Sequence, residues 1–297
     1  MRRLDDRDDI EAYGVDDHAP RVPFTSSFEQ LALDRLALAR YVLDIEPDVV
    51  IHLQSVQRSS EEGSTTAPDE RMVGALALFG AIERLETVSH VIVKSDSAVY
   101  GSSPRNPSIL HESATTRGDA DRFARDLTEM ESFLASARER HPHVDFTVLR
   151  FAPILGPNIG NPISRYVTLP IVPTMMGFDP RLQFIGEDDA VAAIVHAMDN
   201  PTDGTFNIAA QGQLYLSRVL RLGHRAPQFL PGRVYDSAIR ALAQADLRVP
   251  AHLRGLLKHG RVLDTTAMRT MLRFHPVRTC RQTVLHAYGR LPEPADA

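Results

Sequence analysis

Apolar residues occur along this chain in short strand-length runs, which alternate with longer segments that have helical spacing. The strand-like runs lie at residues 10–15, 48–53, 90–95 and 145–150. The helix-like segments lie at residues 28–43, 70–85 and 120–140, the first of them behind the capping residues Ser26 and Ser27. Strands that alternate with helices in this way predict βαβ units, and therefore an α/β fold with a parallel sheet.

The second half of the chain departs from this alternation. Residues 153–180 are rich in proline and glycine, which favours turns and loops over regular elements. Beyond them, residues 187–198 are predicted to form a helix, because Val191, Ile194 and Met198 recur on one face. A further strand ends at Ile208. We therefore expect two lobes, of which the second begins near the proline-rich stretch.

Composition narrows the class of protein. The chain has 297 residues and is 43% hydrophobic, which is enough to bury a large core. Its 33 basic and 38 acidic residues give a net charge of -5, so we expect neither nucleic acid nor an anionic membrane as a partner. It lacks an apolar run of about 18 residues and an apolar signal core. The single cysteine, Cys280, excludes an internal disulfide. We expect a cytoplasmic protein.

Six motifs occur in an informative order. They are Lys-Ser-Asp-Ser-Ala-Val-Tyr-Gly at 94–101, the helical segment 122–131, Leu-Arg-Phe-Ala-Pro-Ile-Leu-Gly-Pro at 149–157, and the segments 184–190, 204–208 and 264–276. In order and spacing they resemble the NAD-dependent epimerase/dehydratase family, the extended short-chain dehydrogenases, and above all the UDP-glucose 4-epimerases. The resemblance runs from about residue 10 to about residue 276.

The resemblance implies a Rossmann-like, doubly wound parallel sheet with a smaller C-terminal substrate lobe. We expect residues 1–156 to form an incomplete NAD-binding domain and residues 157–297 the substrate lobe, with about 184–210 returning to the sheet. Relatives dimerise through two helices, so the resemblance also implies a homodimer formed by residues 70–85 and 120–140. Its ligand would be a nucleotide sugar.

The strand, glycine-rich turn and helix that would hold the pyrophosphate of NAD do not precede Ile10. Residues 1–9 are predicted instead to be the end of that first helix and its exit loop. Roughly 25 further residues would supply the unit. A start upstream and a naturally shorter chain are the two explanations. We therefore expect NAD to bind a form that includes the unit rather than this chain. The glycines at 156 and 160 lack the strand-turn-helix context to replace it.

The predicted cofactor contacts lie at strand ends. Asp16 and Asp17 follow a predicted strand, where a carboxylate can accept hydrogen bonds from the ribose hydroxyls of NAD. An ordinary turn that ends the strand is the alternative explanation. The remaining candidates for the cofactor are Leu53, Gln54, Ser55 and Ser95.

The chemistry of the family uses a tyrosine as acid or base, a lysine four residues later, and a serine or threonine that orients the substrate hydroxyl. The resemblance places these roles on Phe123, Leu127 and Asp96. Phenylalanine carries no proton to transfer, and leucine cannot lower a pKa or bind a ribose. An apolar stripe at helical spacing is formed by Phe123, Leu127, Met130 and Leu134, which indicates a helix packed into a core.

Other residues could take over the missing roles. Asp96 and Tyr100 are candidates for a displaced acid or base, although an aspartate at a strand end commonly binds nearby backbone. Candidate substrate contacts are Ser97, Pro153 and Arg261, the last in a basic stretch that is either a diphosphate site or a solvated helix face. The pair His141 and His143 lacks further ligands close in sequence, so we expect no metal site.

Three functional hypotheses follow. The leading one is a pseudoenzyme: a protein that binds, or descends from proteins that bind, NAD and a nucleotide sugar, and that acts as a sensor or partner subunit. The second is an active NAD-dependent UDP-sugar 4-epimerase or reductase that uses a displaced acid or base. The third is a structural, dimerising interaction protein without a ligand.

Overall fold

The computed structural model describes residues 2–5, 7–16, 18–20, 22–31, 35–53, 78–115, 121–245 and 247–291. The chain forms two units, one of residues 1–50 and 61–89 and the other of residues 51–60 and 90–297. The Rossmann-like α/β fold class is confirmed, because the largest sheet is built from strands that alternate with helices.

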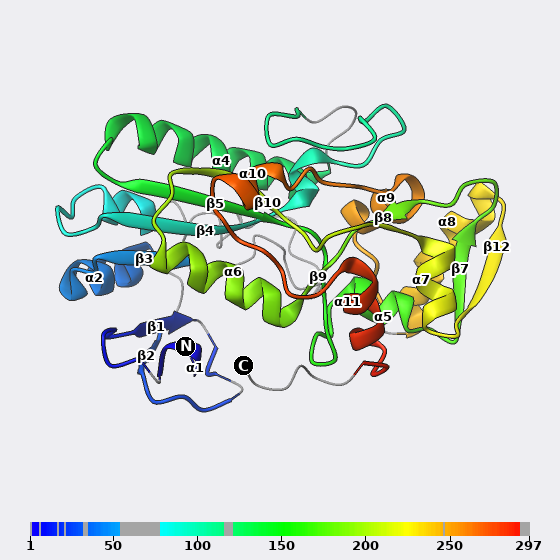
Figure 1. The fold of residues 1–297 in the computed structure, drawn as a ribbon, viewed down its shortest axis with the longest axis horizontal. Coiled ribbons are helices and arrows are strands. Elements are labelled where there is room, and N and C mark those ends of the chain that lie inside the picture. Colours follow the sequence, from blue (N-terminus) through cyan, green and yellow to red (C-terminus); the bar gives the residue numbers. More distant parts are fainter. Residues whose placement is uncertain are drawn as a thin grey trace. The chain divides into compact units, whose positions relative to one another are not determined.

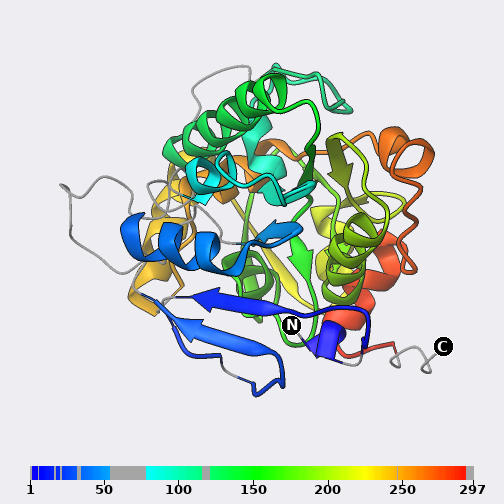
Figure 2. The ribbon, with the colours of Figure 1, turned by 90° about the vertical axis from the view of Figure 1, so that its left-hand side faces the viewer.

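The first unit contains a small parallel sheet. Its elements are α1 (Arg2–Asp5), β1 (Tyr13–Asp16), β2 (Ser27–Gln30) and α2 (Arg35–Ile45). Strands β1 and β2 run parallel and side by side, with Tyr13 opposite Ser27 (Figure 2). Residues 78–82 are helical and belong to the predicted helix at 70–85, whose residues 70–77 lie outside the described part.

The predicted helix at residues 28–43 was wrong at its start. Residues 28–30 belong to β2 and pair with β1, so their backbone groups bond to a strand instead of to the next helical turn. The helix forms from Arg35, and its apolar residues Leu38 and Val42 are buried. Ser26 and Ser27 therefore come at the start of a strand and do not cap a helix. Pairing of residues 27–30 with β1 outweighs the local preference of these residues for a helix start.

The central sheet has the strand order β10-β5-β4-β3 (Figure 1). Its strands are β3 (Val49–His52), β4 (His90–Asp96), β5 (Asp145–Phe151) and β10 (Gly204–Ile208). β5 pairs in parallel with both β4 and β10. Val91, Ile92 and Val93 are fully buried, which explains why β4 reads as a continuous apolar run: a parallel strand is covered on both faces.

Two helices cover opposite faces of this sheet. They are α4 (Arg122–Arg140) and α6 (Glu187–Asp199), and Figure 1 shows them on either side of β4 and β5. Asp121 caps α4 by accepting a hydrogen bond from the amide of Ala124 at 2.9 Å. The predicted apolar stripe of α4 is confirmed at Leu127, Met130 and Leu134, which are at most 2% exposed.

The rest of the second unit consists of short elements that follow β5 in sequence. Three two-stranded sheets pair β6 with β9, β7 with β12, and β8 with β11. Their strands are β6 (Ile154–Leu155), β7 (Ile171–Met175), β8 (Arg181–Leu182), β9 (Ile185–Gly186), β11 (Leu214–Tyr215) and β12 (Ala226–Leu230).

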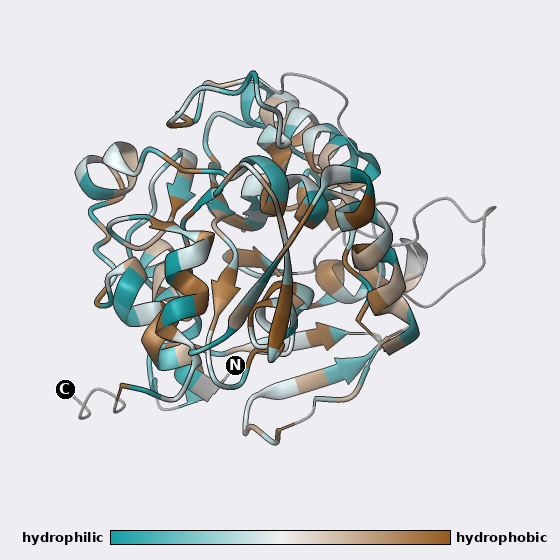
Figure 3. Ribbon diagram, turned by 90° about the vertical axis from the view of Figure 1, so that its right-hand side faces the viewer, coloured by the Kyte–Doolittle hydropathy of each residue, from teal (hydrophilic) through white to brown (hydrophobic). Residues whose placement is uncertain are grey.

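Helices accompany these small sheets. They are α5 (Pro162–Val167), α7 (Leu216–Leu222), α8 (Gly232–Ala241), α9 (Ala251–His259), α10 (Thr266–Thr270) and α11 (Cys280–Ala287). Figure 3 shows apolar strands in the interior and helices with mixed apolar and polar faces around them. The predicted lobe boundary near residue 156 stays a prediction. In the part of the chain that the structure describes, no helix combines the length and the hydropathy that crossing a membrane requires.

The apolar stripe of α4 predicts a large stability loss on truncation. Leu134→Ala removes a side chain that is 1% exposed, and we expect it to lower the free energy of unfolding by about 2–5 kcal/mol, because it leaves a cavity against the sheet. The neighbouring Ser132→Ala, on the outer side of the helix, should change it by no more than about 0.5 kcal/mol. Urea denaturation measures both, and equal effects would contradict this packing.

Candidate functional site

The candidate site lies at the carboxyl end of β4, where ligands bind in open α/β sheets. The 3-10 helix η1 (Ser97–Tyr100) follows β4 directly, and all four of its residues are buried. Asp96 caps this helix, since its carboxylate accepts a hydrogen bond from the amide of Ala98 at 2.6 Å. Asp96 therefore has the backbone-binding role that its strand-end position suggested.

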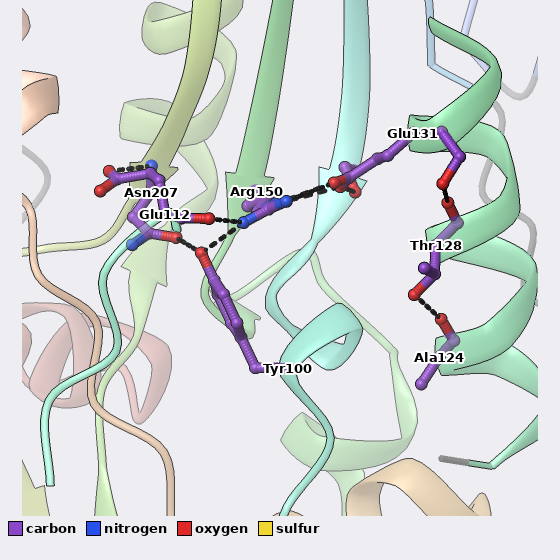
Figure 4. Close-up of polar contacts among 9 residues, drawn as sticks. Tyr100, Glu112, Ala124, Thr128, Glu131, Arg150 and Asn207 are labelled. Atoms are coloured by element: carbon purple, nitrogen blue, oxygen red, sulfur yellow. Dashed lines mark hydrogen bonds and ion pairs between the residues drawn. The ribbon is translucent and has the colours of Figure 1, made fainter. Parts of the chain in front are cut away.

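A buried ion pair lies next to η1 and connects β5 with α4 (Figure 4). The Nη2 of Arg150 lies 2.5 Å from Oε2 of Glu131, and its Nε also donates to both carboxylate oxygens, at 3.0 and 3.1 Å. The two side chains are 13% and 10% exposed. Burial is the largest influence on the pKa of Arg150 and lowers it. The hydrogen bonds and charge interactions with Glu131 and Tyr100 together outweigh burial and leave the pKa above its usual value, so the guanidinium stays charged.

The same guanidinium extends the network to three further elements. Its Nη1 donates to the hydroxyl of Tyr100 and to the carbonyl of Glu112, both at 2.7 Å. The hydroxyl of Tyr100 donates in turn to the side-chain Oδ1 of Asn207 at 2.7 Å. The backbone amide of Asn207 donates to the carboxylate of Glu112 at 2.9 Å. η1, β10 and the loop at residue 112 are thereby fixed to β5.

Two predicted site residues belong to this network. Tyr100 is 1% exposed, and its hydroxyl both accepts from Arg150 and donates to Asn207. Burial raises its pKa, although the positive charge of Arg150 opposes the shift. Ser95, a predicted cofactor contact, is equally buried and donates its hydroxyl to Glu131 at 2.5 Å. Both side chains are occupied in holding the fold.

The positions aligned with the family's tyrosine and lysine differ in their surroundings. Leu127 is 2% exposed and lies in the core. Phe123, in the first turn of α4, is half-buried and its ring lies 4.5 Å from the imidazole ring of His252, centroid to centroid. His252 comes from the first turn of α9, more than a hundred residues away, and sequence reasoning missed it. No local motif marks it, because only the tertiary fold brings α9 to α4.

Charged groups surround this ring pair. Burial lowers the pKa of His252, while the carboxylates of Asp96 and Asp121 oppose the shift and the positive charge of Arg261 adds to it. The imidazole is therefore neutral at pH 7. We call Asp96, Asp121, Phe123, His252 and Arg261 the Phe123 cluster.

Arg261 was predicted as a substrate contact within a basic stretch, and it lies against η1. It is 6% exposed, and its guanidinium donates to Ser97, Ser102 and the carbonyl of Gly101. Ser97, another predicted substrate contact, is fully buried and accepts one of these bonds at 3.1 Å. Burial lowers the pKa of Arg261, opposed by Asp96 and Asp121.

Three of the other predicted contacts lie within the described residues. Pro153 follows β5, and its carbonyl accepts from the amide of Ile185 at 3.2 Å. Asp16, at the end of β1, accepts from the amide of His18 at 3.2 Å, and Leu53 is 50% exposed. Three predicted cofactor contacts lie outside the described residues: Asp17, Gln54 and Ser55.

Two features of the described residues bear on the binding of NAD. Gly156 and Gly160 lie between β6 (Ile154–Leu155) and α5 (Pro162–Val167), so the expectation that they lack a strand-turn-helix context was wrong. This strand has only two residues and pairs with β9, outside the central sheet. At the position that the resemblance gives to a ribose-binding lysine, Leu127 is apolar and buried. The described residues also contain no group of three or more acidic, histidine or cysteine side chains placed to hold a metal ion.

Comparison with known proteins identifies the family. The model of the NAD dependent epimerase/dehydratase family matches residues 1–209. The chain belongs to this family. An uncharacterized protein of Mycobacterium tuberculosis (strain H37Rv) is 35% identical over 244 residues, which are 80% of this chain and 64% of that protein. The UDP-glucose 4-epimerase of Mycoplasma pneumoniae is 29% identical over 141 residues, 45% of this chain and 39% of that enzyme. The chain thus spans 64% of the length of its Mycobacterium relatives.

Solved structures of the family share the fold. The UDP-glucose 4-epimerase of Thermotoga maritima, determined with UDP-glucose, matches with a TM-score of 0.70 and 18% identity over 94% of this chain and 89% of that one. The UDP-glucose 4-epimerase of Thermus thermophilus, in complex with NAD, matches with a TM-score of 0.70 and 17% identity over 94% of this chain and 90% of that one. The predicted family and fold are therefore confirmed.

The buried Arg150–Glu131 pair predicts that losing one of its charges lowers the free energy of unfolding more than losing a charge of an exposed pair. Glu131→Gln leaves the guanidinium buried without its counter-charge, so we expect the free energy of unfolding to fall by about 3–5 kcal/mol. Asp236→Asn breaks the more exposed pair with Lys258 and should cost no more than about 1 kcal/mol. Urea denaturation compares the two, and similar losses would show that Glu131 does not hold the network.

The lowered pKa of His252 predicts a loss of stability in acid. Below the unfolded-state pKa of about 6.5 the unfolded chain binds a proton that the folded chain excludes, so falling pH favours unfolding. His252→Phe keeps an aromatic ring against Phe123 and removes this titration. Between pH 7 and 5, wild type should lose up to about 1.4 kcal/mol per pH unit relative to the variant. Parallel stability curves for the two proteins would contradict a depressed pKa.

Proposed function

We propose that this member of the epimerase/dehydratase family binds a nucleotide sugar and has lost hydride transfer through a tyrosine–lysine pair. The observation that carries the proposal is the surroundings of α4: the ring of Phe123 packs against that of His252 at an angle of 41°, and Leu127 packs into the core. A benzyl ring has no proton to exchange near neutral pH, and a buried isobutyl group neither binds a ribose nor lowers a neighbour's pKa.

The displaced acid or base of the alternative hypothesis finds less support. Tyr100 is buried, with its hydroxyl bonded on both sides, and burial raises its pKa away from the neutral range that proton transfer requires. The carboxylate of Asp96 caps η1 through the amide of Ala98. Either residue would have to give up a structural hydrogen bond in order to react.

Binding of a nucleotide sugar is supported by the fold neighbours. The Thermotoga maritima enzyme was determined with UDP-glucose, and an epimerase of Stenotrophomonas maltophila was determined with NAD and formylated UDP-arabinopyranose. We transfer the ligand class to this chain, whose role would be that of a sensor or a partner subunit. NAD is proposed only for a form that includes the strand-turn-helix unit.

A homodimer through α4 and the predicted helix at residues 70–85, in the cytoplasm, completes the proposal. The length of α4, 19 residues, allows such an interface, and the exposed residues of its outer face include Arg122, Arg125 and Glu129. An interaction protein that binds no ligand is the competing candidate.

Binding and turnover separate these candidates. We expect UDP-glucose to bind wild type in calorimetry and to raise its melting temperature, while chromatography after incubation with NAD detects no UDP-galactose. Phe123→Tyr is the matched variant: its ring can keep the contact with His252, so folding should be unchanged, and without a lysine at 127 it should also remain inactive.

Turnover by wild type would contradict the proposal and favour a displaced acid or base. If neither UDP-glucose nor NAD shifted the melting temperature, the interaction-protein hypothesis would replace it. Activity in the double variant Phe123→Tyr with Leu127→Lys would show that the candidate site still accepts the family's substrate.

A further inference from the structure

Positive charge is concentrated near one end of the sequence, and the net charge of the whole chain conceals this. Residues 1–215 contain 33 acidic and 19 basic residues, whereas residues 216–290 contain three acidic and 14 basic ones. A segment with a net charge of -14 is thus followed by one with a net charge of +11. Such an asymmetry indicates an anionic partner for the basic segment, although the overall charge of -5 argues against one.

The structure places part of this charge on the outer sides of two helices. Arg218 and Arg221 belong to α7, and Arg233 and Arg240 belong to α8. All four are exposed. In the described part of the chain, no carboxylate lies within ion-pair distance of any of them. Their positive charge therefore faces solvent without a counter-charge.

Carboxylates near these helices are engaged with other groups. Asp236 of α8 pairs with Lys258 at 2.6 Å. Asp179 accepts a hydrogen bond from the amide of Ser217, in the first turn of α7, at 3.0 Å. The second bond also fixes the loop at residues 176–180 to the start of α7.

Exposed apolar side chains lie at the same end of the second unit. Met176, Phe178, Phe229 and Val234 are each between 51% and 58% exposed, and we call them the apolar tip. The amide of Met176 donates to the carbonyl of Leu230 at 2.8 Å, which joins the loop after β7 to the end of β12. Val234 follows in the first turn of α8. A group of large apolar side chains this exposed indicates a surface that binds something.

The apolar tip and the arginines border one another. Phe178 and Phe229 line a hollow together with Leu216 and Ser217, and Arg218 is the next residue of α7. On the other helix, Arg233 directly precedes Val234 of the tip. Figure 1 shows α7, α8, β7 and β12 gathered at its right-hand end. One end of the second unit thus combines exposed cations with exposed apolar groups.

An anionic phospholipid surface offers partners for both kinds of group. Its headgroups attract arginines, and the boundary between headgroups and acyl chains accepts apolar side chains. A nucleic acid offers phosphates and base edges, but no comparable place for the aliphatic side chains of Met176 and Val234. The cytoplasmic leaflet of membranes is anionic, so it is accessible to a protein in the proposed compartment.

We propose that the apolar tip and the arginines of α7 and α8 bind the surface of an anionic phospholipid membrane. The four apolar side chains enter the headgroup region, and the guanidinium groups bind lipid phosphates. Membrane binding goes beyond the proposed function and does not depend on it, because no residue of this surface belongs to the Phe123 cluster. The chain can therefore hold a nucleotide sugar and a membrane at the same time.

Co-sedimentation with lipid vesicles tests the proposal. We expect wild type to bind vesicles of phosphatidylglycerol and phosphatidylcholine at least about tenfold more tightly than vesicles of pure phosphatidylcholine, because each arginine near an anionic surface contributes about a fivefold factor in affinity. Raising the salt concentration to about 1 M, where the screening length is about 3 Å, should release most of the bound protein.

Paired variants locate the binding surface. Arg218→Gln with Arg233→Gln should weaken binding to the anionic vesicles by about 20-fold. The matched control is Arg40→Gln with Arg105→Gln, which removes the same charge at exposed positions elsewhere and should weaken binding by less than about threefold.

The contribution of the apolar tip is measured without changing the charge. Phe178→Ser with Phe229→Ser should weaken binding to the anionic vesicles by about tenfold or more. Circular dichroism and thermal melting check that each variant folds. If the first arginine pair fails that check, Arg221→Gln with Arg240→Gln removes two other arginines of the same surface and should have a similar effect.

Equal binding of wild type to the two kinds of vesicle would overturn the proposal, as would equal losses in an arginine pair and its control. Tighter binding to a short DNA duplex than to the anionic vesicles, measured by fluorescence anisotropy, would assign the surface to nucleic acid instead. Loss of self-association in the arginine pair, without vesicle binding by wild type, would assign it to a second copy of the chain. Calorimetry with UDP-glucose tests the proposed function separately from all of these outcomes.

Discussion

The buried pair of Arg150 and Glu131 is the interaction on which the second unit depends. A charge taken out of water is tolerated only where its partner and its remaining donors are satisfied. Arg150 meets this condition by binding Glu131, the hydroxyl of Tyr100 and the carbonyl of Glu112. Asn207 in turn accepts a hydrogen bond from the hydroxyl of Tyr100. One guanidinium therefore connects α4, β5, η1 and β10, and loss of either charge would affect all four at once.

This network also places the candidate site. Glu131 fixes the rotation of α4, so that Leu127, one turn earlier, faces the core and Phe123, a further turn earlier, meets α9. Tyr100 fixes the end of η1, which leaves Ser97 and Ser102 available to hold Arg261. The family's scaffold is thus intact around positions whose side chains differ from those of its usual chemistry, which is the basis for proposing recognition without hydride transfer.

Sequence reasoning succeeded where a local pattern reflects burial on both sides of an element. The continuous apolar run of β4 and the stripe through Met130 and Leu134 predicted a buried strand and a core helix, and both are observed. It failed at residues 28–30, which have polar and apolar residues compatible with either a helix or an exposed strand. Pairing with β1, a contact between separate segments, decided for the strand.

The family, the parallel α/β fold and the apolar character of positions 123 and 127 could all be established from the sequence, because order, spacing and periodicity are properties of the chain. The partners of those positions could be found only in the folded protein. His252 and Arg261 lie more than a hundred residues from Phe123 and Ser97 along the chain, and no periodic pattern relates them. Their contacts exist because the packing of α9 against α4 and η1 brings together side chains that are far apart in the sequence. The residues next to each of them in the chain do not indicate which distant segment will pack there.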